Sequence, residues 1–363
     1  MCGIVGFTGS QAAAPVLLEG LKKLEYRGYD SAGIAVQHDG CIQTAKASGH
    51  LDKLCALIHD GADVPGCCGV GHTRWATHGA PTVSNAHPHL SNDGLFAVVH
   101  NGIIENYAQL KQELSDKGFQ FNSETDTEVV VHLLDMYYTG DLKAAVMKTA
   151  ARLEGSYALG VVCAEHPGQL AAIRCASPLI LGVGVGENFF ASDVTALIGH
   201  TRNVIYLEDG EFALLSPEKI RVFDCAGEEI QKSVTRVAWS MEAAEKGGYE
   251  HFMLKEIMEQ PRALKATIDP RVKDGHIELD GVQFDGEWLA GLRSVVITAC
   301  GSAYHAGCVG RYVMEELCRL PVQVEVASEL RYRNPIIDEH TLVVVISQSG
   351  ETADTIAAMK ECK

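Results

Sequence analysis

Two segments of the chain, residues 294–317 and 341–363, repeat one order of elements. Each begins with an uninterrupted apolar run (SVVITA, TLVVVI), passes through a short turn containing Gly and Ser, and ends in a helical pattern. A strand that is apolar at every position is buried on both faces, and strands that alternate with helices form parallel sheets. This feature predicts a doubly wound parallel-sheet domain, and one that is incomplete, because only two clear units are present.

The region before residue 240 has a different pattern of short strands and a few helices. Residues 17–24 and 107–114 place apolar side chains at helical spacing, and Thr125 and Glu128 fit a capping box before the helical segment VVVHLLDMYY. The segments SYALGVVC, LILGVG and VIYLEDGEFALLS resemble strands, the last with an Asp-Gly turn. This mixture predicts an α+β domain in which strands are layered against helices.

The composition changes between these two regions, in the charged and Gly-containing segment SMEAAEKGGYEHFMLKEIMEQP. With 363 residues the chain is long enough for two domains of about 100–200 residues each. We therefore predict a first domain over residues 1–240, a linker over 241–260 and a second domain over 261–363.

Charge and cysteine content limit the partners and the compartment. The formal net charge of -17 argues against a broad surface for nucleic acid or an anionic membrane. No apolar run approaches the roughly 20 residues needed to cross a bilayer. The 12 cysteines are scattered and no secretory signal precedes them, so we expect reduced thiols and a cytoplasmic protein.

Cys2 follows the initiator methionine and precedes an apolar run, GIVGF. A thiol attacks as the thiolate, and because an ordinary cysteine has a pKa of about 8.5 it needs a base at neutral pH. An α-amino group, with a pKa of about 7.7–8.0, supplies that base if Met1 is removed, since amine and thiol then share one residue. The alternative interpretation is a small apolar residue that begins a buried strand.

Four further segments accompany Cys2: LEYRGYDSAG, GHTRWATHG, HNGIIEN and SETDTE. Together they resemble the class II glutamine amidotransferase domain, whose N-terminal-nucleophile (Ntn) fold is a four-layer αββα arrangement. Three later segments, YEHFMLKEIMEQP, ACGSAYHAG and SQSGETADT, extend the resemblance along the chain to the glutamine–fructose-6-phosphate aminotransferase family, in which a sugar isomerase (SIS) domain follows.

The resemblance implies an enzyme that hydrolyses L-glutamine to glutamate and ammonia. It implies transfer of the ammonia to fructose 6-phosphate, giving glucosamine 6-phosphate for hexosamine biosynthesis. It further implies no cofactor and no metal, and a homodimer where the second domain is complete or complemented.

The catalytic residues follow from the matching motifs. The resemblance makes Cys2 the nucleophile and makes Asn101 and the backbone N–H of Gly102 the oxyanion hole. A tetrahedral oxyanion needs such preorganised donors, and losing one donor reduces the rate by about 100- to 1000-fold. The dipeptide Asn101-Gly102 is also typical of a type I′ turn, and the two interpretations are compatible.

The glutamine-binding residues implied by the resemblance lie in three of these motifs: Arg74, Thr77, His78, Gly102 and Asp126. The planar guanidinium of Arg74 suits the α-carboxylate of glutamine, and Asp126 suits its α-ammonium. The alternatives are that Arg74 is a surface residue and that Asp126 is a carboxylate of a first helical turn.

Three residues frame this site in the family. Arg27 and Asp30 match positions beside the nucleophile, and Trp75 matches the aromatic residue that covers glutamine and gates the exit of ammonia. A tryptophan in the core or in an interface is the alternative for Trp75.

The second half of the chain carries a predicted phosphate site. The segment SQSGET follows an apolar strand and opens a helix, so its hydroxyls and N–H groups converge on a positive helix end. Simple helix capping is the alternative. The sugar-phosphate residues that the resemblance implies are Ser302, Ser347, Gln348, Ser349 and Thr352.

Two departures from the family qualify this site. Ala303 stands where a hydroxyl residue is usual, which affects one sugar contact. The chain also ends at Lys363, before the acid–base residues of the isomerase, so we expect ammonia production without completed amino-sugar synthesis by this chain alone.

Three other functions are alternatives to this interpretation. Five histidines (His72, His78, His87, His89, His100) cluster in sequence, but without zinc-ligand spacing, so a metallohydrolase is not expected. A non-catalytic sugar-phosphate-binding regulator is the principal alternative, because the second domain is partial. An amidotransferase of the purine pathway is a third possibility, which the SQSGET segment argues against.

Overall fold

The computed structural model describes residues 2–25, 29–76, 79–237, 248–273, 275–279, 285–348, 350 and 352–363. The chain forms two compact units, Met1–Ala244 and Glu245–Lys363. The predicted spans of the first domain (1–240), the linker (241–260) and the second domain (261–363) stay predictions.

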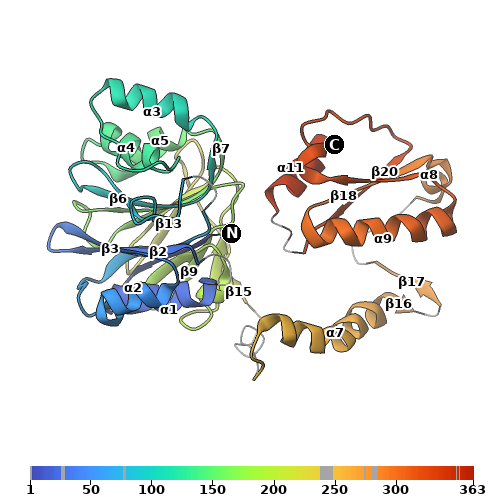
Figure 1. The fold of residues 1–363 in the computed structure, drawn as a ribbon, viewed down its shortest axis with the longest axis horizontal. Helices are drawn as coiled ribbons and strands as arrows, with labels where there is room; N and C mark the ends of the chain where they lie inside the picture. Colours follow the sequence, from blue (N-terminus) through green and yellow to red (C-terminus); the bar gives the residue numbers. More distant parts are fainter. Residues whose placement is uncertain are drawn as a thin grey trace. The chain divides into compact units, whose positions relative to one another are not determined.

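The first unit contains two antiparallel sheets that stack face to face (Figure 1). Across the first sheet the strands are β15 (Thr235–Arg236), β11 (Asn203–Tyr206), β9 (Ile180–Val183), β10 (Asn188–Ala191), β1 (Gly3–Thr8), β4 (Cys68–Arg74), β2 (Ser31–His38) and β3 (Cys41–Ser48). Across the second they are β14 (Glu229–Ile230), β13 (Ile220–Phe223), β12 (Phe212–Leu215), β8 (Leu170–Cys175), β7 (Gly155–Cys163), β6 (Phe96–Ile104) and β5 (His89–Leu90).

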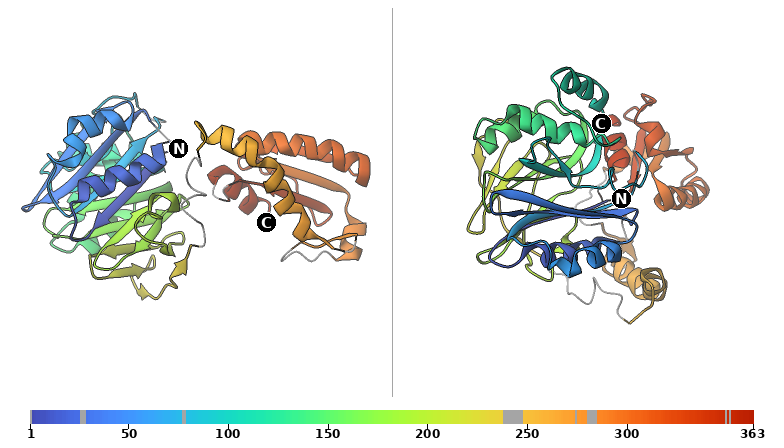
Figure 2. Two further views of the ribbon diagram at one scale, coloured as in Figure 1. Left: turned by 90° about the horizontal axis from the view of Figure 1, so that it is seen from below. Right: turned by 60° about the vertical axis from the view of Figure 1, so that its left-hand side comes forward.

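Helices cover the outer face of each sheet, so the first unit has four layers in the order αββα (Figures 1 and 2). On the first sheet lie α1 (Ala13–Leu24) and α2 (Leu51–Leu57), and on the second lie α3 (Tyr107–Asp116), α4 (Glu128–Tyr137) and α5 (Leu142–Ala150). Short 3-10 turns are η2 (His59–Gly61) and η3 (Val194–Ala196). The predicted layering is confirmed, as are the helices expected over residues 17–24 and 107–114.

Three apolar clusters fill the three spaces between these layers, as the alternation of side chains along β1 shows. Val5 and Phe7 pack with α1, whereas Ile4 joins the cluster between the two sheets. In that middle cluster the ring of Phe190 lies against Gly6 and Gly160, where a Cβ would collide with it. Glycines on facing strands thus admit one large ring into the space between the sheets.

Of two local predictions for this unit, one is incomplete and the other is wrong. The Asp-Gly turn forms, with the N–H of Glu211 donating to the carbonyl of Glu208 at 3.1 Å. However, β11 before the turn pairs with β9 and β12 after it pairs with β8, so the turn joins the two sheets rather than closing a hairpin. The capping box is wrong: α4 begins at Glu128, and Thr127 in the N-cap position makes no side-chain capping bond.

The second unit begins with α7 (Phe252–Ile268), η4 (Asp269–Arg271) and a small hairpin of β16 (Val272–Lys273) and β17 (His276–Ile277). There follow α8 (Gly286–Gly291), β18 (Ser294–Ala299), α9 (Gly301–Cys318), β19 (Val322–Val326), α10 (Ala327–Leu330), β20 (Thr341–Ile346) and α11 (Ala353–Glu361). The sheet order is β19-β18-β20, and all pairs are parallel, as predicted.

Burial of the two predicted strands differs from the expectation. The central strand β18 is almost entirely buried, but every residue of β20 is only half-buried. β20 is an edge strand of a three-stranded sheet, so it has a neighbour on one side only. In the described part of the chain, no helix is long and apolar enough to cross a membrane.

Candidate active site

Cys2 lies at the start of β1, in the middle of the first sheet. Because Gly3 pairs with Thr73 of the antiparallel strand β4, the residues that follow β4 lie beside Cys2. The N–H of Trp75 donates to Cys2 Sγ at 3.3 Å, and Sγ is 3.5 Å from the Trp75 carbonyl oxygen. Sheet register therefore brings the nucleophile candidate against the predicted glutamine-binding motif, 73 residues away in sequence.

The protonation state of the Cys2 thiol is set by competing influences. Burial raises the pKa of Cys2, while the N–H of Trp75 and the charge of Arg74 lower it, and burial dominates. The thiol is therefore protonated at neutral pH and needs a base before it can attack.

Asn101 and Gly102 lie inside β6, paired with Ala158 and Tyr157 of β7. The type I′ turn that the dipeptide suggested is therefore wrong. Gly102 has a φ of 128°, and a Cβ at this position would collide with the carbonyl oxygen of Ser156. Only glycine fits here, because of both the dihedral angle and the close approach of β7.

The amide of Asn101 is held from both sides. Its Nδ2 donates to the carbonyl oxygen of Cys2 at 3.1 Å. Its Oδ1 is 3.0 Å from Nε2 of His72, on β4. The side chain that the sequence predicted for the oxyanion hole is thus in direct contact with the residue that carries the nucleophile.

Arg74 and Asp126 supply the predicted pair of opposite charges, and both are buried. Nη1 and Nη2 of Arg74 donate to the carbonyl oxygens of Ala80 and Gly79, each at 3.2 Å. Asp126 Oδ2 accepts the N–H of Ile104 at 2.8 Å. Neither charge is a surface feature, so the alternative of a solvated arginine is wrong for Arg74.

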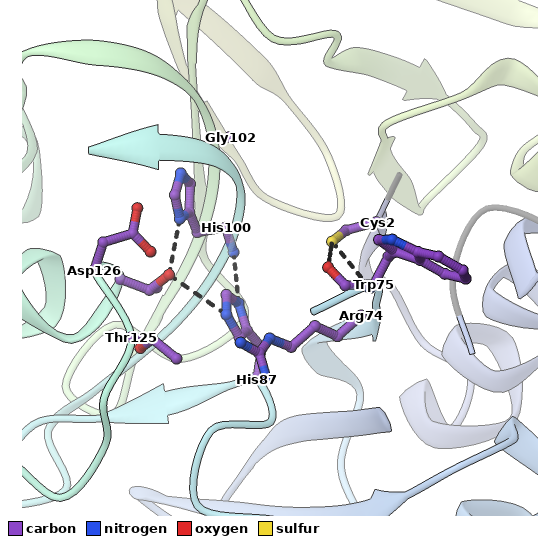
Figure 3. A pocket seen from close by; sticks show the side chains of 9 residues that line it. Cys2, Arg74, Trp75, His87, His100, Gly102, Thr125 and Asp126 are labelled. Carbon is purple, nitrogen blue, oxygen red and sulfur yellow. Dashed lines mark hydrogen bonds between the residues drawn. The ribbon is translucent and has the colours of Figure 1, made fainter. Parts of the chain in front are cut away.

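One pocket contains most of these groups, and Figure 3 shows Cys2 and Asp126 on opposite sides of it. The residues that line it are Cys2, Arg74, Trp75, His87, His100, Gly102, Thr125, Asp126 and Thr127. A thiol, a cation and an anion that border one cavity are the groups required to bind an amino acid and attack its side chain.

Trp75 lies at the rim of this pocket with 42% of its surface exposed. Its ring contacts Tyr29 edge to face, with centroids 5.3 Å apart, and Tyr29 in turn stacks on His50. Asp30 Oδ2 accepts the N–H of Ala76 at 2.8 Å and so fixes the chain just after Trp75. Thr77, His78 and Arg27, which the sequence analysis also assigned to this site, lie outside the described residues.

Four residues of the pocket were not predicted to be part of the site: His87, His100, Thr125 and Thr127. His100 Nδ1 is 2.8 Å from Thr127 Oγ1, and the N–H of His100 donates to His87 Nδ1 at 3.2 Å. Burial lowers the pKa of both imidazoles, so they are neutral hydrogen-bonding groups. The available signal was their position, since His100 lies within the matched motif HNGIIEN and Thr125 and Thr127 lie within SETDTE; the clustering of histidines suggested only metal ligation.

No group of three or more His, Cys, Asp or Glu side chains that suits a metal ion is present among the described residues. In the histidine cluster the rings stack instead: the centroids of His72 and His87 are 4.2 Å apart at an interplanar angle of 17°.

The predicted phosphate residues of the second unit lie at the carboxyl edge of its parallel sheet. The ladder between β18 and β20 ends at Ala299 and Ile346; α9, which contains Ser302, begins two residues after Ala299, and Ser347 directly follows Ile346. The N–H of Gly350 donates to Ser347 Oγ at 3.0 Å, and Thr352 Oγ1 is 3.4 Å from the same hydroxyl.

The other members of this set occupy less informative positions. Gln348 is exposed, and Ser302 and Ala303 lie in the first turn of α9. Ser349 lies outside the described residues.

Comparison with known proteins places each unit in a family. Residues 40–221 match the glutamine amidotransferase domain, and residues 289–363 match the SIS domain. The chain is 56% identical over 364 aligned positions to a glutamine–fructose-6-phosphate aminotransferase (isomerizing) of Caldanaerobacter subterraneus subsp. tengcongensis. It is 53% identical to the protein of the same name in Clostridium tetani. Both alignments cover all of this chain and 60% of the relative, so the chain spans about 60% of the length of these relatives.

Solved structures show the same fold at low sequence identity. A glutamine phosphoribosylpyrophosphate amidotransferase from B. subtilis has a TM-score of 0.56 at 22% identity, covering 89% of this chain and 65% of that one. A second structure, described as the allosteric regulatory enzyme of purine biosynthesis, has a TM-score of 0.59 at 21% identity and covers 98% and 91% of the two chains. The αββα unit is thus the Ntn-type fold of glutamine amidotransferases. The chain belongs to the glutamine amidotransferase family, and along its whole length it is similar to the glutamine–fructose-6-phosphate aminotransferases.

Proposed function

We propose that this chain hydrolyses L-glutamine with Cys2 as the nucleophile, and that the ammonia released serves the amination of fructose 6-phosphate. The observation that carries the first part is that one pocket is lined by the Cys2 thiol, the buried guanidinium of Arg74 and the buried carboxylate of Asp126. These three groups come from separate parts of the sequence, and they are complementary to the side-chain carboxamide, the α-carboxylate and the α-ammonium of glutamine.

The proposed reaction proceeds by acyl transfer. Cys2 Sγ attacks the side-chain carboxamide carbon of glutamine, and the thiol proton passes to the α-amine of Cys2 after removal of Met1. Asn101 and Gly102 donate to the oxyanion that forms. The amine returns the proton to the departing nitrogen, ammonia leaves, and water hydrolyses the thioester to release glutamate. Because burial raises the pKa of the Cys2 thiol, a base is needed to take its proton, and the α-amine of the same residue is such a base.

Binding of glutamine uses the two opposite charges. Arg74 pairs with the α-carboxylate and Asp126 with the α-ammonium. Thr77 and His78 belong to the segment that follows Arg74, and we assign them contacts with the bound amino acid. Trp75, half-exposed at the rim, covers the substrate and gates the release of ammonia.

The test is a glutamate-release assay on matched cysteine variants. Cys2→Ala should abolish hydrolysis because no other thiol lines the pocket in the described residues. Cys41→Ala, on an exposed residue at the start of β3, is the control and should retain full activity. An uncleaved amino-terminal extension should also abolish activity, and intact mass spectrometry reports whether Met1 is present. Glutamate release by Cys2→Ala would refute the assignment.

For the second unit we propose fructose 6-phosphate as ligand, bound through Ser302, Ser347, Gln348, Ser349 and Thr352. Support comes from hydroxyls and N–H groups gathered at the beginning of α11, which suit a phosphate. Titration calorimetry with fructose 6-phosphate should detect binding that Ser347→Ala weakens by about 10-fold or more. Binding without any glutamate release would favour the regulator instead.

We also propose a homodimer where the second domain is complete or complemented, and a reducing cytoplasmic location. The support for the second is that exposed thiols such as Cys41, Cys67 and Cys225 are unpaired. Light scattering on the purified full chain measures the oligomeric state directly.

A further inference from the structure

The amide of Asn101 can point in two directions, and only one of them serves catalysis. With Nδ2 toward Cys2 it presents N–H groups at the thiol side of the site, whereas a flipped amide would present an oxygen, which repels an oxyanion. The neighbours of Asn101 therefore decide whether it works as a donor.

Hydrogen-bond chemistry around His72 determines that direction. His72 Nε2 lies 2.9 Å from the carbonyl oxygen of His100 and 3.0 Å from Asn101 Oδ1. The His100 carbonyl is an acceptor only, so Nε2 must carry the proton, and the atom of Asn101 that it meets must be the oxygen. On the other side the carbonyl of Cys2 accepts from Nδ2 at 3.1 Å, which requires the same orientation independently.

The environment keeps His72 in this form. The side chain is 1% exposed, and burial lowers the pKa of His72 to about 3, so the ring is neutral and has a single N–H. Its Nδ1 is buried without a hydrogen-bond partner among the described residues. The ring of His87 stacks on it at 4.2 Å, which restricts rotation of the imidazole.

We propose that His72 is a positioning residue for glutamine hydrolysis: its Nε2–H holds Asn101 Oδ1, so that Nδ2, which donates one N–H to the Cys2 carbonyl, has its second N–H for the oxyanion. This inference rests on the proposed glutaminase function. Neither His72 nor Asn101 is among the residues that line the pocket, and His72 lies behind Asn101, in contact with its Oδ1 and with the ring of the lining residue His87.

Kinetic measurements distinguish a positioning role of His72 from a structural role and from a role as general acid or base. A residue that positions an oxyanion donor acts in the transition state, so its loss lowers kcat and leaves the KM for glutamine unchanged. A merely structural histidine would lower thermal stability or raise KM instead. A general acid or base would remove a limb of the pH–rate profile, whereas a positioning residue leaves the profile unchanged.

The experiment compares His72→Gln with His72→Phe in the full chain. The amide nitrogen of glutamine stands as many bonds from Cα as Nε2 of histidine does, so Gln supplies the donor in nearly the same place, and Phe supplies a ring without one. We expect His72→Phe to lower kcat by about 10- to 100-fold at constant KM, and His72→Gln to recover most of the loss. His72→Asn, whose shorter amide reaches only the position of Nδ1, should behave like Phe.

A double-mutant cycle with Asn101→Ala completes the test. If His72 acts through Asn101, adding His72→Phe to Asn101→Ala should reduce kcat by less than about two-fold. Calorimetric binding of glutamate to each variant shows whether its site is intact. If His72→Phe is too unstable to be compared, the kcat of His72→Gln and that of His72→Asn should still differ.

Three outcomes would overturn the proposal: equal kcat for His72→Gln and His72→Phe, a rise in KM in place of the fall in kcat, or the same fold-loss with and without Asn101. Each of these leaves the proposed function standing. Wild-type protein that releases no glutamate from glutamine would instead overturn the proposed function and this inference together.

Discussion

Gly102 shows how one residue combines a structural and a functional requirement. Its dipeptide with Asn101 is typical of a turn, yet both residues lie within the β6–β7 ladder. The positive φ and the close approach of Ser156 exclude any side chain at this position, while the preceding residue contacts Cys2. A glycine inside a strand is therefore the condition for bringing the proposed oxyanion donors beside the proposed nucleophile.

Gly102→Ala should damage both stability and activity, because the added Cβ collides with backbone rather than with a movable side chain. We expect a loss of about 2–4 kcal/mol in the free energy of unfolding, measured with urea, and a fall in kcat of at least about 10-fold.

Gly94→Ala is the matched control for this prediction. Gly94 also has a positive φ, 76°, but nothing lies within 4 Å of the Cβ position, so only the strain of about 1–2 kcal/mol applies. Its kcat should not change. If the two variants lose equal stability and Gly102→Ala remains fully active, close packing against Ser156 is not what selects glycine.

At the scale of elements, the segment between α3 and α4 carries Asp126 and is held by Glu128. The Glu128 carboxylate, 2% exposed, accepts the N–H groups of Asn122 and Ser123 at 2.8 and 2.7 Å and the hydroxyl of Ser123 at 2.7 Å. The sequence predicted a capping box with Thr125, but the carboxylate reaches further back along the chain. One buried side chain thereby ties the whole loop to the start of α4.

The pH dependence of stability should report this anchor. Burial by itself raises the pKa of Glu128, but the nearby His132 and the hydrogen bonds from Asn122 and Ser123 outweigh it and hold the pKa below its usual range. A carboxyl group whose pKa is lowered on folding stabilises the protein above its unfolded pKa, about 4.3 for Glu. That stability is lost as the pH falls from about 5 towards the lower folded pKa.

Glu128→Gln should therefore remove part of the acid sensitivity. At pH 7 we expect a loss of about 1–3 kcal/mol in the free energy of unfolding, and a smaller difference from wild type at low pH. Glu228→Gln, at an exposed position of the same unit, is the control and should change stability by less than about 0.5 kcal/mol. A constant difference between Glu128→Gln and wild type from pH 7 to pH 3 would contradict this account.

At the scale of the whole molecule, the two units differ in how much apolar surface they bury. The first has three extensive clusters, one in each space between layers. In the second, two small clusters flank the parallel sheet, and among the described residues of α7 only Lys255 is buried. Burial of apolar surface dominates stability, so we expect the second unit to be the less stable one.

Scanning calorimetry of the full chain should accordingly resolve two transitions, with the second unit unfolding first. Ligands assign the transitions, because each stabilises only the unit that binds it. Glutamate should raise the temperature of the upper transition, and fructose 6-phosphate that of the lower one. At saturating concentration we expect each ligand to add about 1–3 kcal/mol to the free energy of unfolding of the unit that binds it. A single transition that both ligands shift equally would show that the units unfold together.

The residue pattern was sufficient to predict the helices at residues 17–24 and 107–114 and the parallel strands of the second unit, whereas the four-layer class of the first unit was implied by the family resemblance. Apolar periodicity and chemical motifs are local properties, so they can be read without the fold. The candidate chemistry of Cys2, Arg74 and Asp126 followed for the same reason, since it depends on residue type within matched motifs.

The way in which distant segments meet is visible in the folded chain and not in the sequence. The fold assigned the strands on either side of Asp209-Gly210 to different sheets, placed Asn101 and Gly102 in a strand, and brought His72 onto Asn101 Oδ1. These outcomes depend on hydrogen bonds and packing between residues far apart in the chain, such as Asn101 and Cys2, 99 positions apart. No local pattern encodes such pairings, because each residue fits its own strand or loop whether or not the distant partner is present.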